Sequence, residues 1–462
     1  MKNIESPGIK TLSIHLILFI ITLITTTLAG SEWIHGRWFF VNENNTTGWN
    51  QWMDWEMFLK GFYYSIPFLG ILTVHEFGHY FTARFYKIKV SLPYFIPFFF
   101  GFGFSIGTFG TFIRIKSRMK HRKHLFDVGI AGPLAGFVVA IMLLFYGFTH
   151  LPPPKYIFNI HTEYILPYIE VIKKENPELY KKFTHEIIAE QKILFNVIQY
   201  FPELNPEEQE EIAIVLAIEK FINNPEEFKT RKGLLSEIRI VLNKFDYSYI
   251  VYKNTGGSLA LGNNLIFMFF ERFVVENPRL IPNKYEMWHY PFLLAGYLAL
   301  FFTALNLIPI GQLDGGHILY GLVGSKNHRI ISPIFFLIFV FYAGLGLVEL
   351  FDKIPIFGFP IYTAPLYWWG LCILFSKVFK GFYKVMLFSL AFMALQFSFS
   401  NLFPTIEGYP GWLVFALLLS MLGVYHPPAQ YEKPLNTKRK ILGWISLIIF
   451  ILCFTPVPLV LE

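Results

Sequence analysis

A short pattern near residue 75 combines two metal-binding side chains with a carboxylate. His75, Glu76 and His79 form the pattern H-E-x-x-H within an otherwise apolar stretch. A helix advances about 100° and 1.5 Å per residue, so the two imidazoles lie on one face, close enough to hold one metal ion. Glu76 points about 100° away from His75, where it can take a proton from a metal-bound water. The structural alternative is a hydrogen-bonded polar network, but buried ionisable groups in apolar helices usually carry function.

A site with two histidines needs at least one more protein ligand and an open position for water. Aspartate is rare in this chain, and Asp314 stands out because it follows a long uncharged run within the string NLIPIGQLDGGH at 306–317. Asn306 and Pro309 interrupt the helix expected there. Unwound backbone inside a membrane is tolerated only where it is buried or lines a watery cavity. Asp314 is therefore the candidate third ligand.

The depths of the two motifs agree if both lie in membrane helices. The apolar residues before His75 place it in the inner third of a bilayer core about 30 Å thick. The uncharged run 291–313 is expected to form one span that enters from the outer side, so that Asp314 also approaches the inner side. These two independent counts bring His75, His79 and Asp314 to a similar depth.

The composition requires such a membrane setting. Of 462 residues, 54% are hydrophobic and only 15% are charged, whereas soluble domains carry about 25% charged residues. The net charge of +7 does not indicate nucleic-acid binding, because the basic residues cluster beside apolar runs, as in cytoplasmic loops of membrane proteins. Cys372 and Cys453 lie in apolar segments and are expected to be packing residues.

We therefore expect an all-α polytopic membrane protein with about eight or nine transmembrane helices. The Pro-, Gly- and Phe-rich stretch 93–112 is too irregular for a helix and is expected to form a re-entrant, β-hairpin-like loop. The expected organisation is an N-terminal span and outer loop at 1–54, a first part of the core at 55–150, a mostly helical extramembrane insert at 151–286, a second part of the core at 287–325 and additional C-terminal helices at 326–462.

The charges also predict an orientation. With a cytoplasmic amino terminus, the basic run 114–123 and three later basic loops all fall on the inner side. The candidate site then lies toward the cytoplasmic side of an integral, multi-pass membrane protein. The first apolar run, 11–30, is either a retained span or a signal peptide, and the missing A-x-A cleavage pattern favours a retained span.

The sequence resembles the site-2 proteases, a family of intramembrane zinc metalloproteases. The resemblance rests on HEFGH at 75–79, GPLAG at 132–136 and NLIPIGQLDGG at 306–316, and covers roughly 55–150 and 287–325. The string at 304–317 is most similar to the branch that lacks PDZ domains. The insert and the C-terminal helices lie outside the resemblance.

The resemblance implies one zinc ion per chain, held by His75, His79 and Asp314, with Glu76 as the catalytic residue. It also implies Asn306 as a substrate or oxyanion contact. Substrates would be transmembrane proteins within the lipid bilayer, cleaved in or near a membrane segment, as in regulated intramembrane proteolysis. The segment 107–112 resembles the family's hairpin, which could pair with an extended substrate or could be a plain loop.

Several alternatives stay open at the level of sequence. A metal-binding membrane transporter or a non-catalytic family member could use the same ligands, and divalent ions other than zinc suit them. A di-iron site is disfavoured because the additional Glu ligands are missing from the spans.

The small residues at 132–136 are expected to serve helix packing, and His317 is expected to have a structural role. The insert could filter substrates by size or could be a simple solvated domain.

Overall fold

A computed structural model describes residues 9–41, 47–50, 53–103, 105–117, 119–152, 155–158, 160, 177–178, 259–347, 354–356, 359–361 and 363–461. Within these ranges the protein is mostly helical, with three small two-stranded sheets. Five of the described helices are long and apolar enough to cross a membrane, and shorter apolar helices accompany them. The expected class of helical membrane protein is thereby confirmed, whereas the count of eight or nine spans stays a prediction.

The first part of the core contains α1 (Ile9–His35), α2 (Trp55–Lys60), α3 (Phe62–Phe85) and α4 (Arg122–Thr149). Helices α2 and α3 are separated at Gly61. A side chain on Gly61 would overlap the backbone of Thr27 in α1, so this glycine allows the two helices to touch. Helices α3 and α4 also pack closely, since a Cβ on Gly78 would lie 2.6 Å from the Ala131 carbonyl oxygen.

The stretch between α3 and α4 forms a hairpin. Strands β1 (Tyr94–Pro97) and β2 (Thr108–Phe112) pair antiparallel, with Tyr94 opposite Phe112. The hairpin is fastened to α1, where the Thr25 hydroxyl donates a hydrogen bond to the Gly107 carbonyl oxygen at 2.7 Å. A hairpin is therefore present at the expected place, and its re-entry into a membrane stays a prediction.

The second part of the core corrects one expectation. The run 291–313 is not one helix: α12 (Pro291–Leu307) ends before Pro309, and Asp314 is the first residue of α13 (Asp314–Leu345). Proline lacks a backbone N–H and clashes with the preceding turn, so the helix ends before it. Gly311 then adopts a φ of 58°, a conformation that favours glycine. Asp314 thus begins one helix instead of ending another.

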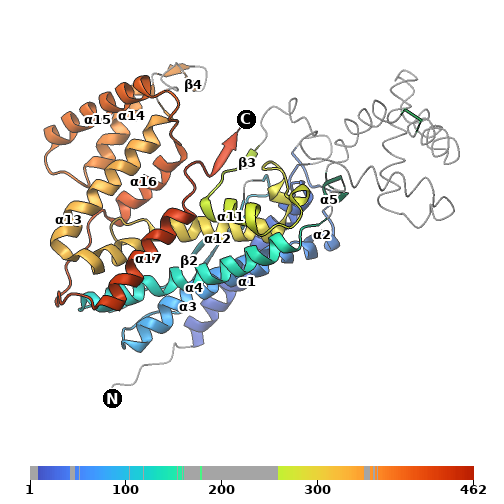
Figure 1. Ribbon diagram of the computed structural model, residues 1–462, viewed down its shortest axis with the longest axis horizontal. Coiled ribbons are helices and arrows are strands. Elements are labelled where there is room, and N and C mark those ends of the chain that lie inside the picture. The colour runs from blue at the N-terminus through green and yellow to red at the C-terminus, as the bar shows by residue number, and fades with distance from the viewer. Residues whose placement is uncertain are drawn as a thin grey trace.

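Four C-terminal helices follow: α14 (Thr363–Phe375), α15 (Phe382–Leu402), α16 (Gly411–Leu422) and α17 (Thr437–Cys453). Figure 1 shows α14, α15 and α16 grouped around α13, whereas α17 runs beside α12. A bidentate ion pair also fastens α17 to α4, since Arg439 Nε lies 2.7 Å from Asp127 Oδ1. These helices pack on α12 and α13 or on one another, and their role as additional membrane spans stays a prediction.

The remaining elements are short: α5 (Lys155–Phe158), η6 (Pro278–Leu280), η7 (Met287–His289), the pair β3 (Leu259–Leu261) and β6 (Leu459–Leu461), and the pair β4 (Ile354–Ile356) and β5 (Phe359–Ile361). The prediction of a mostly helical insert concerns residues that lie mostly outside the described ranges. Its described end contains α11 (Leu265–Phe273), which buries Phe267 and Phe270.

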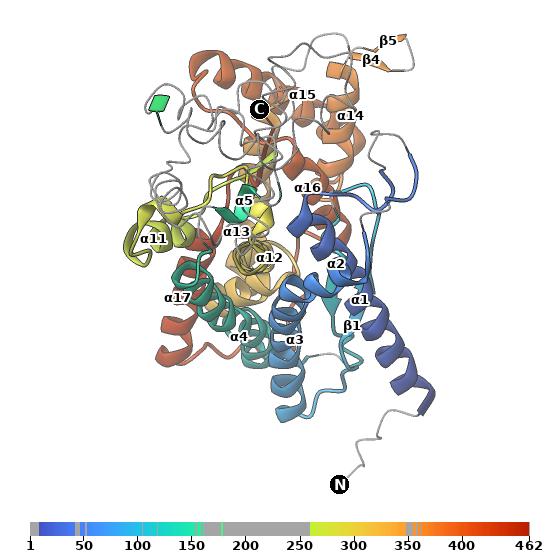
Figure 2. The same ribbon diagram turned by 90° about the vertical axis from the view of Figure 1, so that its right-hand side faces the viewer.

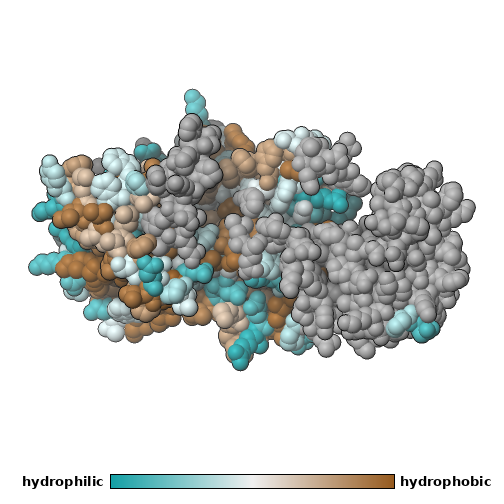
Figure 3. All heavy atoms as spheres, turned by 90° about the horizontal axis from the view of Figure 1, so that it is seen from above, coloured by the Kyte–Doolittle hydropathy of each residue, from teal (hydrophilic) through white to brown (hydrophobic). Residues whose placement is uncertain are grey.

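The elements that carry the two sequence motifs lie together. Figure 2 shows α4, α3 and α1 in a row, with α12 packed against α3 and α4 and lying above them in this view. Apolar side chains gather on the surface of the half that holds the C-terminal helices (Figure 3). Exposed apolar side chains on helices are expected of a protein whose outer surface faces lipid.

Candidate metal centre

Three side chains from α3 and α13 meet at one point. Nε2 of His75 and Nε2 of His79 are 3.0 Å apart. Oδ2 of Asp314 lies 3.5 Å from the first of these atoms and 3.1 Å from the second. The two histidines are 7% and 6% exposed. The three residues predicted as ligands are therefore positioned to bind a metal ion.

The hydrogen bonds of the site prepare His79 for coordination. Its Nδ1 lies 2.7 Å from the backbone carbonyl oxygen of Val128 in α4. A carbonyl only accepts, so Nδ1 carries the proton and Nε2 presents its lone pair toward His75 and Asp314. Zinc accepts a donor set of two imidazoles and one carboxylate, with a further position left for water. The carbonyl that fixes the His79 ring is the kind of partner that such ligands usually have.

Glu76 lies beside this centre and contacts another element. Its side chain is 5% exposed, and Oε1 accepts a hydrogen bond of 3.2 Å from the Thr111 hydroxyl in β2. As expected from the helical angle, the carboxylate is not one of the three grouped ligands. The sequence alone did not identify Thr111 as its partner, because the contact joins residues 35 positions apart.

The small residues of α4 pack directly against the histidines. A Cβ on Gly132 would overlap the His79 imidazole, and one on Gly136 would lie 3.2 Å from the His75 Cβ. The expectation that GPLAG serves packing is thus confirmed. The neighbours of these glycines are the two imidazoles, so the packing also positions the candidate ligands.

Gly132→Ala is expected to weaken zinc binding, because the added methyl group displaces the His79 ring. A loss of at least about tenfold in affinity is expected, as for other changes next to metal ligands. Competition with a chromophoric chelator measures it. The matched control is Gly70→Ala in α3, where a Cβ meets nothing within 4 Å. Equal zinc affinities for the two variants would show that this packing does not matter.

Asp314 is positioned by a turn that the C-terminal part of the chain supports. The Gly311 N–H donates to Ser332 Oγ at 2.9 Å, and that hydroxyl donates to the Val424 carbonyl at 2.7 Å. Val424 belongs to residues 422–432, called the strap here, which begin at the end of α16. The strap also holds Gln312, whose Nε2 donates to the Leu422 carbonyl at 3.1 Å.

His317 contacts the same strap. Its Nδ1 lies 2.8 Å from Nε2 of His426, and Nδ1 of His426 lies 2.6 Å from the Pro427 carbonyl oxygen. A carbonyl only accepts, so Nδ1 of His426 carries the proton of its neutral ring. Nε2 of His426 is then an acceptor, so Nδ1 of His317 donates to it and the two rings form a directed chain. Burial lowers the pKa of His426 and keeps its ring neutral near pH 7. The expectation that His317 is structural agrees with this arrangement.

Asn306, the candidate substrate contact, lies on the last turn of α12. Its side chain is half-buried and forms no hydrogen bond with the other residues that the structure describes. An amide in this position is available to a ligand, but the described contacts assign it no role.

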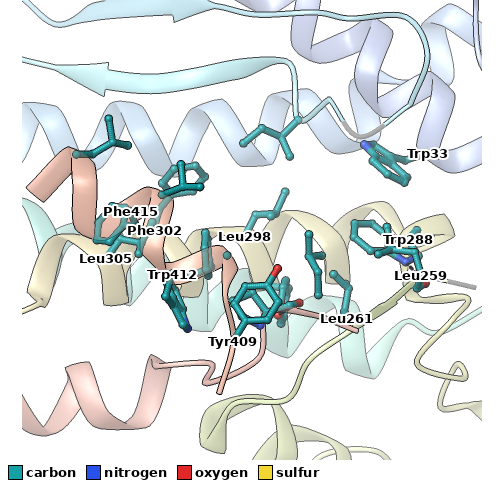
Figure 4. A pocket seen from close by; sticks show the side chains of 18 residues that line it. Trp33, Leu259, Leu261, Trp288, Leu298, Phe302, Leu305, Tyr409, Trp412 and Phe415 are labelled. Atoms are coloured by element: carbon teal, nitrogen blue, oxygen red, sulfur yellow. Dashed lines mark hydrogen bonds between the residues drawn. The ribbon is translucent and has the colours of Figure 1, made fainter. Parts of the chain in front are cut away.

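An apolar pocket of about 350 Å³ runs along α12 from Trp33, near the C-terminal end of α1, to Leu305. Figure 4 shows Trp33 at one end and Leu305 with Phe415 at the other. The indole N–H groups of Trp33 and Trp412 donate to the carbonyls of Ser105 and Pro456, both at 2.7 Å. The pocket is therefore lined by apolar surface and suits an apolar ligand.

Comparison with known proteins agrees with this centre. The model of peptidase family M50 matches residues 63–348, which include all three candidate ligands and Glu76. The chain belongs to peptidase family M50. The predicted resemblance to the site-2 proteases is thereby confirmed. The strap and helices α14 to α17 lie beyond the matched region of this M50 chain.

Relatives with known names match shorter segments. The "Probable zinc metalloprotease EGY2, chloroplastic" of Oryza sativa subsp. indica is 40% identical over 98 residues, which cover 21% of this chain and 17% of the relative. The "Probable zinc metalloprotease EGY1, chloroplastic" of Arabidopsis thaliana is 38% identical over 79 residues, covering 17% and 14%. The matches span less than a fifth of either relative's length. No solved structure matches the chain.

Proposed function

We propose that this M50 chain is a zinc metalloendopeptidase that hydrolyses a peptide bond in or near a transmembrane segment of a membrane protein. One observation carries the proposal. His75, His79 and Asp314 present their ligand atoms to one point, with the carboxylate of Glu76 beside them, and all lie on helices apolar enough to span a membrane. The names of the relatives support zinc as the metal.

Each residue of the centre has a proposed task. His75, His79 and Asp314 would hold the metal, and zinc bound there would supply Lewis-acid chemistry that activates a water and polarises a carbonyl. Glu76 accepts the proton of the attacking water as the new C–O bond forms. It then gives that proton to the leaving nitrogen as the C–N bond breaks. The Thr111 hydroxyl orients the carboxylate through their hydrogen bond.

The substrate has to be extended at the point of cleavage, because a helix hides its peptide groups in internal hydrogen bonds. In the proposal, the unwound segment pairs with the hairpin near Thr111, which places a backbone carbonyl beside Glu76. Asn306 then contacts the substrate backbone, and the apolar pocket along α12 takes side chains of its membrane segment. Product leaves toward the cytoplasmic side, in keeping with regulated intramembrane proteolysis.

Cleavage of single-span substrates by the purified protein tests this function. The panel contains segments with and without Gly or Pro near the cytoplasmic end, since these residues lower the cost of unwinding. We expect cleavage of the helix-broken substrates, its loss in the presence of a zinc chelator and its return when zinc is added. Zinc flux into proteoliposomes without cleavage of any substrate would favour a transporter instead.

A further inference from the structure

Two pockets adjoin each other along the strap. One measures about 310 Å³ and the other about 600 Å³. Both are lined by Gln312, His426, Pro427 and Pro428, so they form one continuous depression, called the strap groove here. Its residues come from the Asp314 turn, the strap, the segment after β2, the helices α4 and α13, and the residues between α14 and α15.

The strap groove is connected to the candidate metal centre from two sides. Gln312 precedes Asp314 by two residues, and His317 lies one helical turn after it. On the other side the groove is lined by Ile115, Lys116 and Ser117, which continue the chain from β2. Thr111 of that strand contacts Glu76. A peptide that follows β2 away from Glu76 therefore reaches this groove.

The charges of the groove have one sign. Lys116, Arg329 and Lys380 line it, and all three are exposed. Neither pocket is lined by an aspartate or a glutamate. The three cationic side chains form no ion pair with any residue that the structure describes. A concave surface lined by cations raises the local concentration of anionic groups.

The structure assigns this groove to an acidic segment of the substrate, next to the membrane segment that is cut. The inference rests on the proposed function. Cations near membrane helices often serve only to orient the protein or to contact lipid headgroups. The peptide is favoured here because the groove includes both neighbours of the metal-ligand turn and the continuation of the strand that contacts Glu76. Acidic residues after the scissile region would then select substrates.

The test measures binding, so it does not depend on cleavage. Fluorescent single-span peptides with three Asp, three Asn or three Lys beside the apolar segment are titrated with the zinc-loaded Glu76→Gln protein in neutral micelles. The groove variant carries Lys116→Glu and Lys380→Glu in addition to Glu76→Gln. The control variant adds Lys326→Glu and Lys384→Glu, which make the same change in net charge with exposed lysines outside the groove.

The acidic peptide is expected to bind about tenfold more tightly than the neutral one, because each exposed ion pair contributes roughly a factor of two to three. The groove variant is expected to lose this preference, and the control variant to keep it. Equal affinities for the three peptides, or equal losses in both variants, would overturn the inference. It would also be overturned if the groove variant bound peptides normally but lost binding to vesicles with anionic lipids.

Cleavage of the same peptides by the wild-type protein separates the two proposals. Charge-selective binding without any cleavage would contradict the protease function and leave the groove intact. Cleavage at rates and affinities that do not depend on the flanking charge would contradict the groove alone.

Discussion

Glu76→Gln is expected to lower the rate of peptide cleavage by about 100- to 10,000-fold, the range that a general base contributes. The amide cannot accept the proton of the attacking water, although it fills the same space and can keep the hydrogen bond from Thr111. Zinc content is expected to stay the same, because Glu76 is not among the grouped ligand atoms. Cleavage kinetics and zinc analysis of the same preparation measure both effects.

The control for this variant is Glu56→Gln. Glu56 lies on α2 and pairs with Lys60 at 3.1 Å on the surface, where such a pair contributes little to stability. The Glu56→Gln substitution is expected to leave the rate of cleavage unchanged. If Glu76→Gln cleaves substrate as fast as the wild type at equal zinc content, Glu76 is not the base and the proposed mechanism is wrong.

Asp314→Asn is expected to reduce zinc affinity by more than about 100-fold, beyond the usual effect of changing a residue that only supports a ligand. The substitution keeps the shape of the side chain but removes the negative charge that faces both imidazoles at 3.5 and 3.1 Å. Cleavage is expected to fall with zinc occupancy. Zinc-binding titration and activity at increasing zinc concentration measure the two quantities.

Asp54→Asn is the matched control for the charge. Asp54 caps α2 by accepting the Met57 N–H at 2.9 Å, and asparagine caps helices about equally well. Its zinc affinity is expected to equal that of the wild type. Zinc binding by Asp314→Asn at wild-type affinity would remove Asp314 from the ligand set and leave the third ligand to be found elsewhere.

The candidate ligand set shows how three residues can lie together as expected although part of the argument that placed them there is wrong. The sequence placed His75, His79 and Asp314 at one depth by counting residues along two helices. The second count assumed a single helix over 291–313, whereas α12 ends at Leu307. The three candidate ligands still meet, because Asp314 begins α13 after the turn that follows α12, where its carboxylate faces both histidines of α3.

The sequence by itself determined the helical membrane class, the H-E-x-x-H pattern and the hairpin region, and it was enough to predict Asp314 as the third ligand. Helical periodicity and apolar run length are local properties, so a single chain reveals them. Only the tertiary structure decided which partners complete the centre: Thr111 for Glu76, Val128 for His79 and the strap for the Asp314 turn. These contacts join distant segments through hydrogen bonds and close packing, and no local pattern specifies which segments will become neighbours.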